Sequence, residues 1–185
     1  MTWLEIDNEH VWHPYNSLPS KTKILPVVST NKTSIFLQTG EELIDAMSSW
    51  WSAIHGYNHP KLNEALKKQV DIMPHIMFGG LAHEQSSLLS QKLVDLTGLH
   101  SVFLCDSGSV SVEVALKTAI LYQKAKGLKK YKFFALEHAY HGDTLGAMSV
   151  CDPQNSMHSI YGSYLSENIF AKAPKLGFLS DNSHE

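Results

Sequence analysis

The strongest constraint on the fold is a strand–loop–helix pattern at residues 101–127. The apolar residues 102–105 predict a short strand, and Asp106-Ser107-Gly108-Ser109 predicts a tight turn because its members are small or polar. From Val110 onwards, apolar residues recur at helical spacing until Gly127, a residue type that commonly ends helices. The pattern therefore indicates an α/β unit with its loop at the start of a helix.

The loop before this predicted helix can hold an anion. The first N–H groups of a helix lack partners within the helix, and the helix dipole favours negative charge there. Gly108 would let a ligand approach the backbone, while the hydroxyls of Ser107 and Ser109 could donate hydrogen bonds. The same residue types also cap helices that bind nothing, so both interpretations remain open.

The motifs for nucleotide binding are missing from this loop. It is neither Gly-x-Gly-x-x-Gly nor followed by Gly-Lys-Ser/Thr, which disfavours a dinucleotide fold and a nucleotide P-loop. A small phosphorylated cofactor stays compatible with the pattern.

A second apolar run at residues 131–136 follows the helix. Strand–helix–strand order implies a right-handed crossover and a parallel sheet, with ligands beyond the carboxyl ends of the strands. We therefore expect residues 137–144 near the phosphate loop, where Tyr140 could stack on a flat ring. His138 and His141 have the spacing of a metal pair, but no third ligand is placed, so we expect no metal site.

The first 82 residues give weaker signals. Residues 1–26 contain three prolines and are predicted to be irregular, with Tyr15 packing an N-terminal arm or contacting a substrate. Residues 34–38 and 42–46 flank a turn and predict a hairpin. Trp50 and Trp51 lie in a loop, where large aromatic side chains serve either as core or as a ligand platform. Helices are predicted at residues 60–73 and 83–97.

Composition restricts the partners. The 185 residues are 43% hydrophobic with a formal charge of −3, which allows a real core and gives no sign of nucleic acid or an anionic membrane as partner. Two cysteines without Cys-x-x-Cys fit a reducing compartment. We see no signal peptide and no apolar stretch long enough for a bilayer, so we expect a cytoplasmic protein.

Two of these segments together resemble the class III aminotransferases, which are pyridoxal-phosphate enzymes: residues 106–110 and the stretch Tyr140-His141-Gly142-Asp143-Thr144. Most of that class carry Gly-Ser-Glu-Ala after the phosphate loop, whereas this chain has Gly108-Ser109-Val110-Ser111. In this departure the chain resembles one branch of the class. The enzymes of that branch transfer an amino group from S-adenosylmethionine to 8-amino-7-oxononanoate in biotin biosynthesis. Further motifs of the branch are Trp12-His13-Pro14-Tyr15, Ser48-Ser49-Trp50-Trp51, His55-Gly56-Tyr57-Asn58-His59-Pro60 and residues 148–153.

The resemblance implies a fold and a domain division. It implies the large domain of a fold type I, aspartate aminotransferase-like pyridoxal-phosphate transferase, a mostly parallel sheet flanked by helices that is incomplete here. Residues 1–46 would form an N-terminal arm and short strands belonging to the small domain. Residues 47–185 would form the first half of the cofactor-binding domain.

The resemblance also implies a cofactor, substrates and their contacts. Pyridoxal 5′-phosphate would be bound by Gly108, Ser109 and Tyr140. The small-molecule substrates would be bound by Tyr15, Trp50 and Tyr140, the product would be 7,8-diaminononanoate, and the full-length enzyme would be a homodimer. The role of Asp143, which belongs to the same motif, stays open.

No catalytic residue is expected within this chain. In the family, a lysine that forms an imine with the cofactor and an acidic partner of its ring nitrogen lie further along the sequence, which implies positions beyond residue 185. The chain alone is therefore expected to be inactive, as a fragment, a truncated product or half of a split enzyme. Two alternatives stay open: a non-catalytic chain, and a class III aminotransferase with another amino donor or acceptor.

Overall fold

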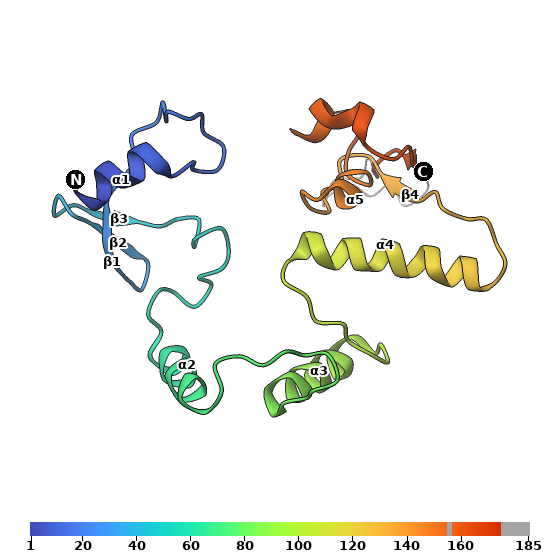
Figure 1. The fold of residues 1–185 in the computed structure, drawn as a ribbon, viewed down its shortest axis with the longest axis horizontal. Coiled ribbons are helices and arrows are strands. Elements are labelled where there is room, and N and C mark those ends of the chain that lie inside the picture. Colours follow the sequence, from blue (N-terminus) through green and yellow to red (C-terminus); the bar gives the residue numbers. More distant parts are fainter. Residues whose placement is uncertain (155–156, 175–185) are drawn as a thin grey trace, which may run out of the picture. The chain divides into compact units, whose positions relative to one another are not determined.

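The computed structural model describes residues 1–154 and 157–174. Contacts divide the chain into two compact units, one ending at Ala82 and one beginning at His83. Figure 1 follows the chain through both units by colour. The domain boundary expected after residue 46 stays a prediction.

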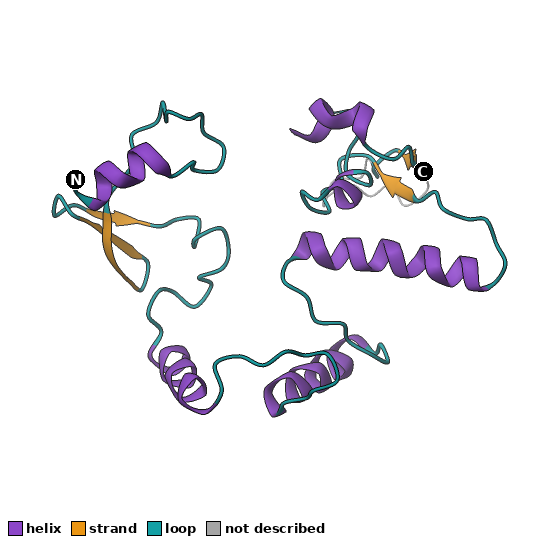
Figure 2. Cartoon of the chain, viewed as in Figure 1, coloured by secondary structure: helices purple, strands orange, loops and turns teal. Residues whose placement is uncertain are grey.

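The first unit contains a three-stranded antiparallel sheet, drawn in orange in Figure 2. Its strands are β1 (Val27–Asn31), β2 (Ser34–Leu37) and β3 (Glu42–Ile44), in that order across the sheet. A tight turn joins β1 and β2, with Asn31 opposite Ser34, and the second turn contains Gly40 at φ 89°. The predicted hairpin is confirmed.

Two helices belong to the first unit, α1 (Trp3–His10) and α2 (Pro60–Ile72). The expectation of an irregular N-terminus is wrong for α1, which begins with a capping box. The Thr2 hydroxyl accepts from the Glu5 N–H (3.3 Å), and the Glu5 carboxylate accepts from the Thr2 N–H (2.6 Å). The prediction of α2 is confirmed, with proline at its start.

The second unit contains the helices α3 (Glu84–Thr97), α4 (Gly108–Ala125) and α5 (Leu145–Met148). α3 ends at Gly98, whose φ of 70° is the left-handed conformation that glycine adopts easily. α5 packs against α4 (Figure 1). The two longer helices agree with the predicted ranges.

The parallel sheet of the second unit differs from the expected one. Its two strands are β4 (Phe134–Leu136) and β5 (Ile169–Ala171), with Phe134 opposite Ile169. The predicted strand at 102–105 pairs with no strand of the described residues, so the expected adjacency to β4 is wrong. β5 was not predicted because three residues are too few to show a strand period; the Asn168 side chain fixes its start by accepting from the Phe133 N–H (2.9 Å).

The chain after Pro153 also contains a 3₁₀ helix, η1 (Met157–Tyr164), where the sequence showed only weak periodicity. The weakly periodic sequence at residues 153–185 predicted only a loop, and its last part, residues 175–185, lies outside the described residues.

The cores of the two units are small. The first unit buries Pro26 and Leu37, and the second unit buries Ala135 and the segment 147–151. This segment lies under the loop that follows β4. Among the residues that the structure describes, no helix has both the length and the apolar content needed to cross a membrane.

Candidate active site

The start of α4 presents unpartnered backbone donors. The N-cap residue Ser107 accepts from the Val110 N–H through its hydroxyl (3.2 Å) and from the Ser111 N–H through its carbonyl (2.9 Å). No described residue accepts from the N–H groups of Gly108 and Ser109. A Cβ atom at Gly108 would meet nothing within 4 Å, so this end of the helix is open on that side.

The loop after β4 lies directly against the start of α4. The Asp143 N–H donates to the Ser109 hydroxyl (2.9 Å). Gly142 has φ 129°, and a Cβ atom there would lie 2.7 Å from the Ser109 Cα. Only glycine permits this approach, because real Cβ atoms do not come so close to a backbone carbon. The expected proximity of this loop to the phosphate loop is confirmed.

Tyr140 is oriented by the same contacts. Its hydroxyl donates to the Asp143 carboxylate (2.9 Å), and its side chain is 64% exposed. Asp143 is therefore tied to Ser109 through its backbone and to Tyr140 through its side chain. The structure thus brings together three predicted cofactor contacts, Gly108, Ser109 and Tyr140, in the second unit.

Residues 149–152 contact the loop after β4 from the interior of the unit. This loop, residues 137–144, is called the Tyr140 loop below. The Cys151 thiol accepts from the His141 N–H (3.2 Å) and donates to the Ala147 carbonyl (3.2 Å). The Asp152 N–H donates to the Ala139 carbonyl (2.9 Å), and its buried carboxylate lies 3.0 Å from His138 Nδ1. His138 thus contacts a carboxylate. The sequence reasoning missed this support, since nothing in the pattern links Cys151 to a loop ten residues earlier.

Glu113 is a second residue that the sequence reasoning missed. Its carboxylate accepts from the Gly146 N–H (2.7 Å) at the start of α5. Thr144 occupies the N-cap position of α5 but makes no side-chain cap bond. The nearby Thr144 hydroxyl, and then the N–H groups of Gly146 and Ala147, hold the pKa of Glu113 below its usual range despite partial burial.

A signal for Glu113 was present in the sequence. It lies four residues after Ser109 on α4, and residues at this spacing share a helix face. Ser109 and Glu113 lie on the same face of α4, where Ser109 contacts the Tyr140 loop and Glu113 contacts α5.

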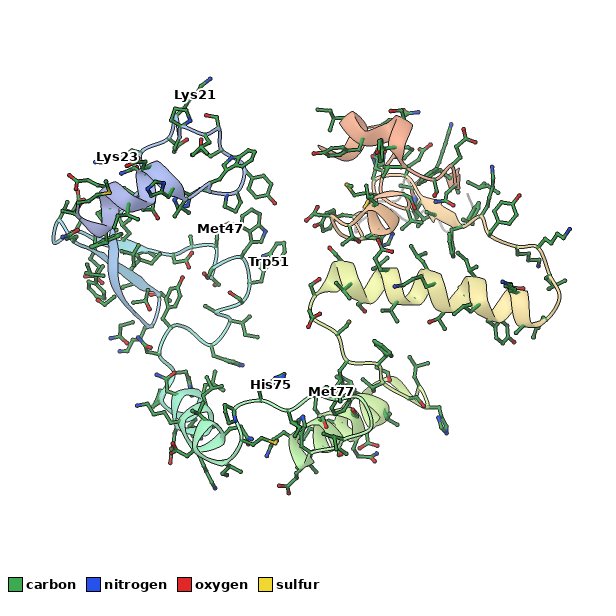
Figure 3. The ribbon with its side chains drawn as sticks, in the orientation of Figure 1. Lys21, Lys23, Met47, Trp51, His75 and Met77 are labelled. Atoms are coloured by element: carbon green, nitrogen blue, oxygen red, sulfur yellow. The ribbon has the colours of Figure 1, made fainter. Side chains whose placement is uncertain are left out.

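The predicted substrate contacts Tyr15 and Trp50 meet in the first unit. Their rings stack with centroids 5.7 Å apart and an angle of 28° between planes. Both rings are largely exposed, as is Trp51, so the tryptophan pair does not form a core in this unit. Figure 3 shows the labelled Trp51 side chain extending from the loop after β3. The core alternative is therefore wrong for this unit, and the ligand platform stays a prediction.

Comparison with known proteins identifies the family. A sequence model described as aminotransferase class-III matches residues 17–185. The chain belongs to the class III aminotransferases. The matched range includes the open start of α4 and the Tyr140 loop.

Similar class III aminotransferases include proteins named adenosylmethionine-8-amino-7-oxononanoate aminotransferase. The protein of Saccharomyces cerevisiae is 50% identical over 182 residues, which cover 94% of this chain and 38% of the relative. The protein of Buchnera aphidicola subsp. Baizongia pistaciae is 49% identical over 177 residues, which cover 95% of this chain and 41% of the relative. This class III chain thus spans about 40% of the length of these relatives.

Solved structures of class III aminotransferases show a similar fold. The adenosylmethionine-8-amino-7-oxononanoate aminotransferase of Methanocaldococcus jannaschii matches with a TM-score of 0.84 and 33% identity, over 92% of this chain and 40% of that one. A PLP-bound aminotransferase mutant of Vibrio fluvialis matches with a TM-score of 0.81 and 25% identity, over 94% and 39%. The expected fold class is confirmed as a partial fold type I domain.

Proposed function

We propose that the intact protein containing this chain transfers the amino group of S-adenosylmethionine to 8-amino-7-oxononanoate, using pyridoxal 5′-phosphate. The product would be 7,8-diaminononanoate, a step of biotin biosynthesis. Relatives bearing the name of this activity are 49–50% identical over more than nine-tenths of the chain, which supports the choice of substrates.

The observation that carries the proposal is the contact between the start of α4 and the Tyr140 loop. Two open N–H groups at Gly108 and Ser109 fit a phosphate. The Ser109 oxygen already accepts from Asp143, and no described residue accepts the hydrogen of its hydroxyl, so that hydrogen can be donated to the phosphate. The donor set therefore suits the phosphate of the cofactor.

The cofactor would supply an electron sink that carries the amino group between donor and acceptor. The residues of this chain would bind and orient. The Tyr140 ring, held by Asp143, would lie against the bound ring system because its loop is fixed to the phosphate-binding helix through Ser109.

Tyr15 and Trp50 would form an apolar surface for both substrates. The aliphatic chain of 8-amino-7-oxononanoate gains from contact with stacked rings. The sulfonium of S-adenosylmethionine is a cation, and aromatic faces attract cations. One platform could therefore serve two substrates of different shape.

Two finer proposals follow from the family resemblance. We propose that the intact protein is a homodimer and that it works in the cytoplasm. Sedimentation of the intact protein and its location by fractionation would test them.

The proposed activity can be tested by complementation. The complete gene should restore growth without biotin to a bacterial strain that lacks this aminotransferase, and a Ser109→Ala, Tyr140→Ala version should not. The purified intact protein should form 7,8-diaminononanoate only with S-adenosylmethionine as donor. Growth that still requires biotin or 7,8-diaminononanoate, or transfer from other amines but not from S-adenosylmethionine, would contradict the proposal.

A further inference from the structure

The loop that carries Trp50 has an unusual backbone. Four consecutive residues without a glycine, Ser48, Ser49, Trp50 and Trp51, have φ values of 48°, 48°, 57° and 72°. A side chain with a Cβ atom disfavours this left-handed region, which is normally visited by single residues. Such conformations persist where the surroundings impose them.

Burial does not impose this conformation. Trp50 is 62% exposed and Trp51 is 70% exposed, so neither ring is packed into the first unit. The constraint must come from hydrogen bonds that hold the turn.

Asp45 supplies those hydrogen bonds. Its carboxylate accepts from the Met47 N–H (3.0 Å) and from the Ser49 N–H (2.6 Å). The turn is closed further by backbone bonds from Trp51 to Met47 (3.2 Å) and from Ala53 to Ser48 (2.9 Å). The Asp45 carboxylate thus accepts hydrogen bonds from both Met47 and Ser49, at the beginning of the turn.

Asp45 is itself anchored to the sheet. Its N–H donates to the Thr33 carbonyl (2.8 Å), and the Tyr57 hydroxyl donates to its carboxylate (2.5 Å). The backbone of Tyr57 forms two hydrogen bonds with Lys32 in the turn between β1 and β2 (2.6 and 3.0 Å). The carboxylate is therefore fixed from two sides by elements of the sheet.

We propose that Asp45 and Tyr57 are a pair of positioning residues that hold residues 48–51 in the left-handed turn and so place Trp50 against Tyr15. The stacked rings then form one preset wall for the substrates. The placement of Trp50 rests on the described contacts alone. The expected effect on substrate binding rests also on the proposed function.

The protonation states suit this role. The Tyr57 hydroxyl, followed by the N–H groups of the turn, holds the pKa of Asp45 below its usual range, and the Asp45 carboxylate raises the pKa of Tyr57. At neutral pH the pair is an ionised acceptor and a neutral donor.

The test uses the intact protein with Asp45→Asn, Tyr57→Phe, Trp50→Ala, and the double variant Asp45→Asn/Trp50→Ala. Asp71→Asn on α2 is the matched control, a carboxylate of the same unit with no hydrogen bond to this turn. We expect KM for 8-amino-7-oxononanoate to rise roughly 10- to 100-fold in Asp45→Asn, with kcat and the cofactor absorbance little changed. The double variant should be no worse than Trp50→Ala, since both changes remove the same wall.

Near-ultraviolet circular dichroism gives a readout independent of activity. Asp45→Asn and Tyr57→Phe should lose the same aromatic signal as Trp50→Ala, while Asp71→Asn keeps it. Tyr57→Phe retains the ring and serves if Asp45→Asn fails to fold.

The inference is overturned if Asp45→Asn and Tyr57→Phe keep the circular dichroism signal and the KM of the Asp71→Asn control. It is also overturned if the double variant raises KM by the product of the increases in Asp45→Asn and in Trp50→Ala. If the wild-type protein transfers no amino group, the proposed function fails, and the dichroism still decides the positioning role.

Discussion

At the residue scale, the space between Ser109 and Gly142 sets the tightest limit on the site. A methyl group at position 142 would overlap the Ser109 backbone, and φ 129° is unfavourable for any residue with a Cβ atom. We expect Gly142→Ala to destabilise the intact protein by about 1–3 kcal/mol. It should also weaken pyridoxal phosphate binding, because the loop must move away from the proposed phosphate site at the start of α4.

Thermal unfolding and titration of the cofactor absorbance would measure both effects. Gly162→Ala is the control, since a Cβ there meets no atom within 4 Å. Equal stability and equal cofactor affinity of the two variants would show that the described approach of the loop is wrong.

Glu113 predicts a pH dependence of stability. Its pKa is lowered in the folded chain by the Thr144 hydroxyl and the N–H groups that start α5. The stabilisation by the carboxylate is therefore fully present above the unfolded pKa of about 4.3 and is lost as the pH falls through the lower folded value. Wild type should be more stable than Glu113→Gln near neutral pH, and the difference should shrink towards about pH 3.

Denaturant titrations of the two proteins at several pH values would check this. A difference in free energy of unfolding that stays constant with pH would contradict the assigned role of the carboxylate.

At the scale of elements, the left-handed turn at residues 48–51 is held against its local preference. Each non-glycine residue there costs about 1–2 kcal/mol relative to a right-handed conformation. Glycine removes this cost but adds about 0.5–1 kcal/mol of backbone entropy. We expect Ser48→Gly to stabilise the protein slightly, while Ser29→Gly within β1 should destabilise it. Denaturant titration would give the free energy of unfolding of each variant. A loss of stability in both would contradict the claim that residue 48 is strained.

The elements that the sequence predicted are those with a strong local signal. Pro60 at the start of α2 and Gly98 at the end of α3 mark both helices, and Gly40 marks a hairpin turn. α1 carried an equally local signal, the Thr2–Glu5 capping box, but three nearby prolines outweighed it. Pairing of strands was less predictable because it depends on residues far apart: β4 pairs with β5, more than thirty residues later, and not with residues 102–105.

The candidate site divides in the same way. The open amides at Gly108 follow from the loop–helix pattern, which the sequence shows. The proximity of the Tyr140 loop was expected from a pairing of residues 102–105 that does not occur, and in the structure it comes from the hydrogen bond between the Asp143 N–H and the Ser109 hydroxyl. Asp45 and Cys151 act through contacts with the backbone of other residues, and no residue spacing in the sequence indicates those contacts. The stack of Tyr15 on Trp50 joins residues 35 positions apart and needed the structure.

At the scale of the whole molecule, the described residues bury few of their apolar side chains. The stripe on α2 formed by Leu62, Leu66 and Val70 is 48–65% exposed, and Leu121 on α4 is 64% exposed. Contiguous exposed apolar faces of this kind usually meet another surface. The 185-residue chain produced alone is therefore expected to self-associate.

Size-exclusion chromatography with light scattering would test this. The chain alone should elute as higher oligomers or aggregates, whereas the intact protein should give one defined species. A monodisperse, cooperatively melting monomer of the 185-residue chain would contradict the expectation.

The two cysteines differ sharply in access, since Cys151 is buried beneath the Tyr140 loop and Cys105 is exposed just before the α4 cap. Within this chain, a maleimide dye would therefore label one site. Its emission would report binding of phosphate at the proposed site, the open start of α4 at Gly108 and Ser109, without any chemical turnover.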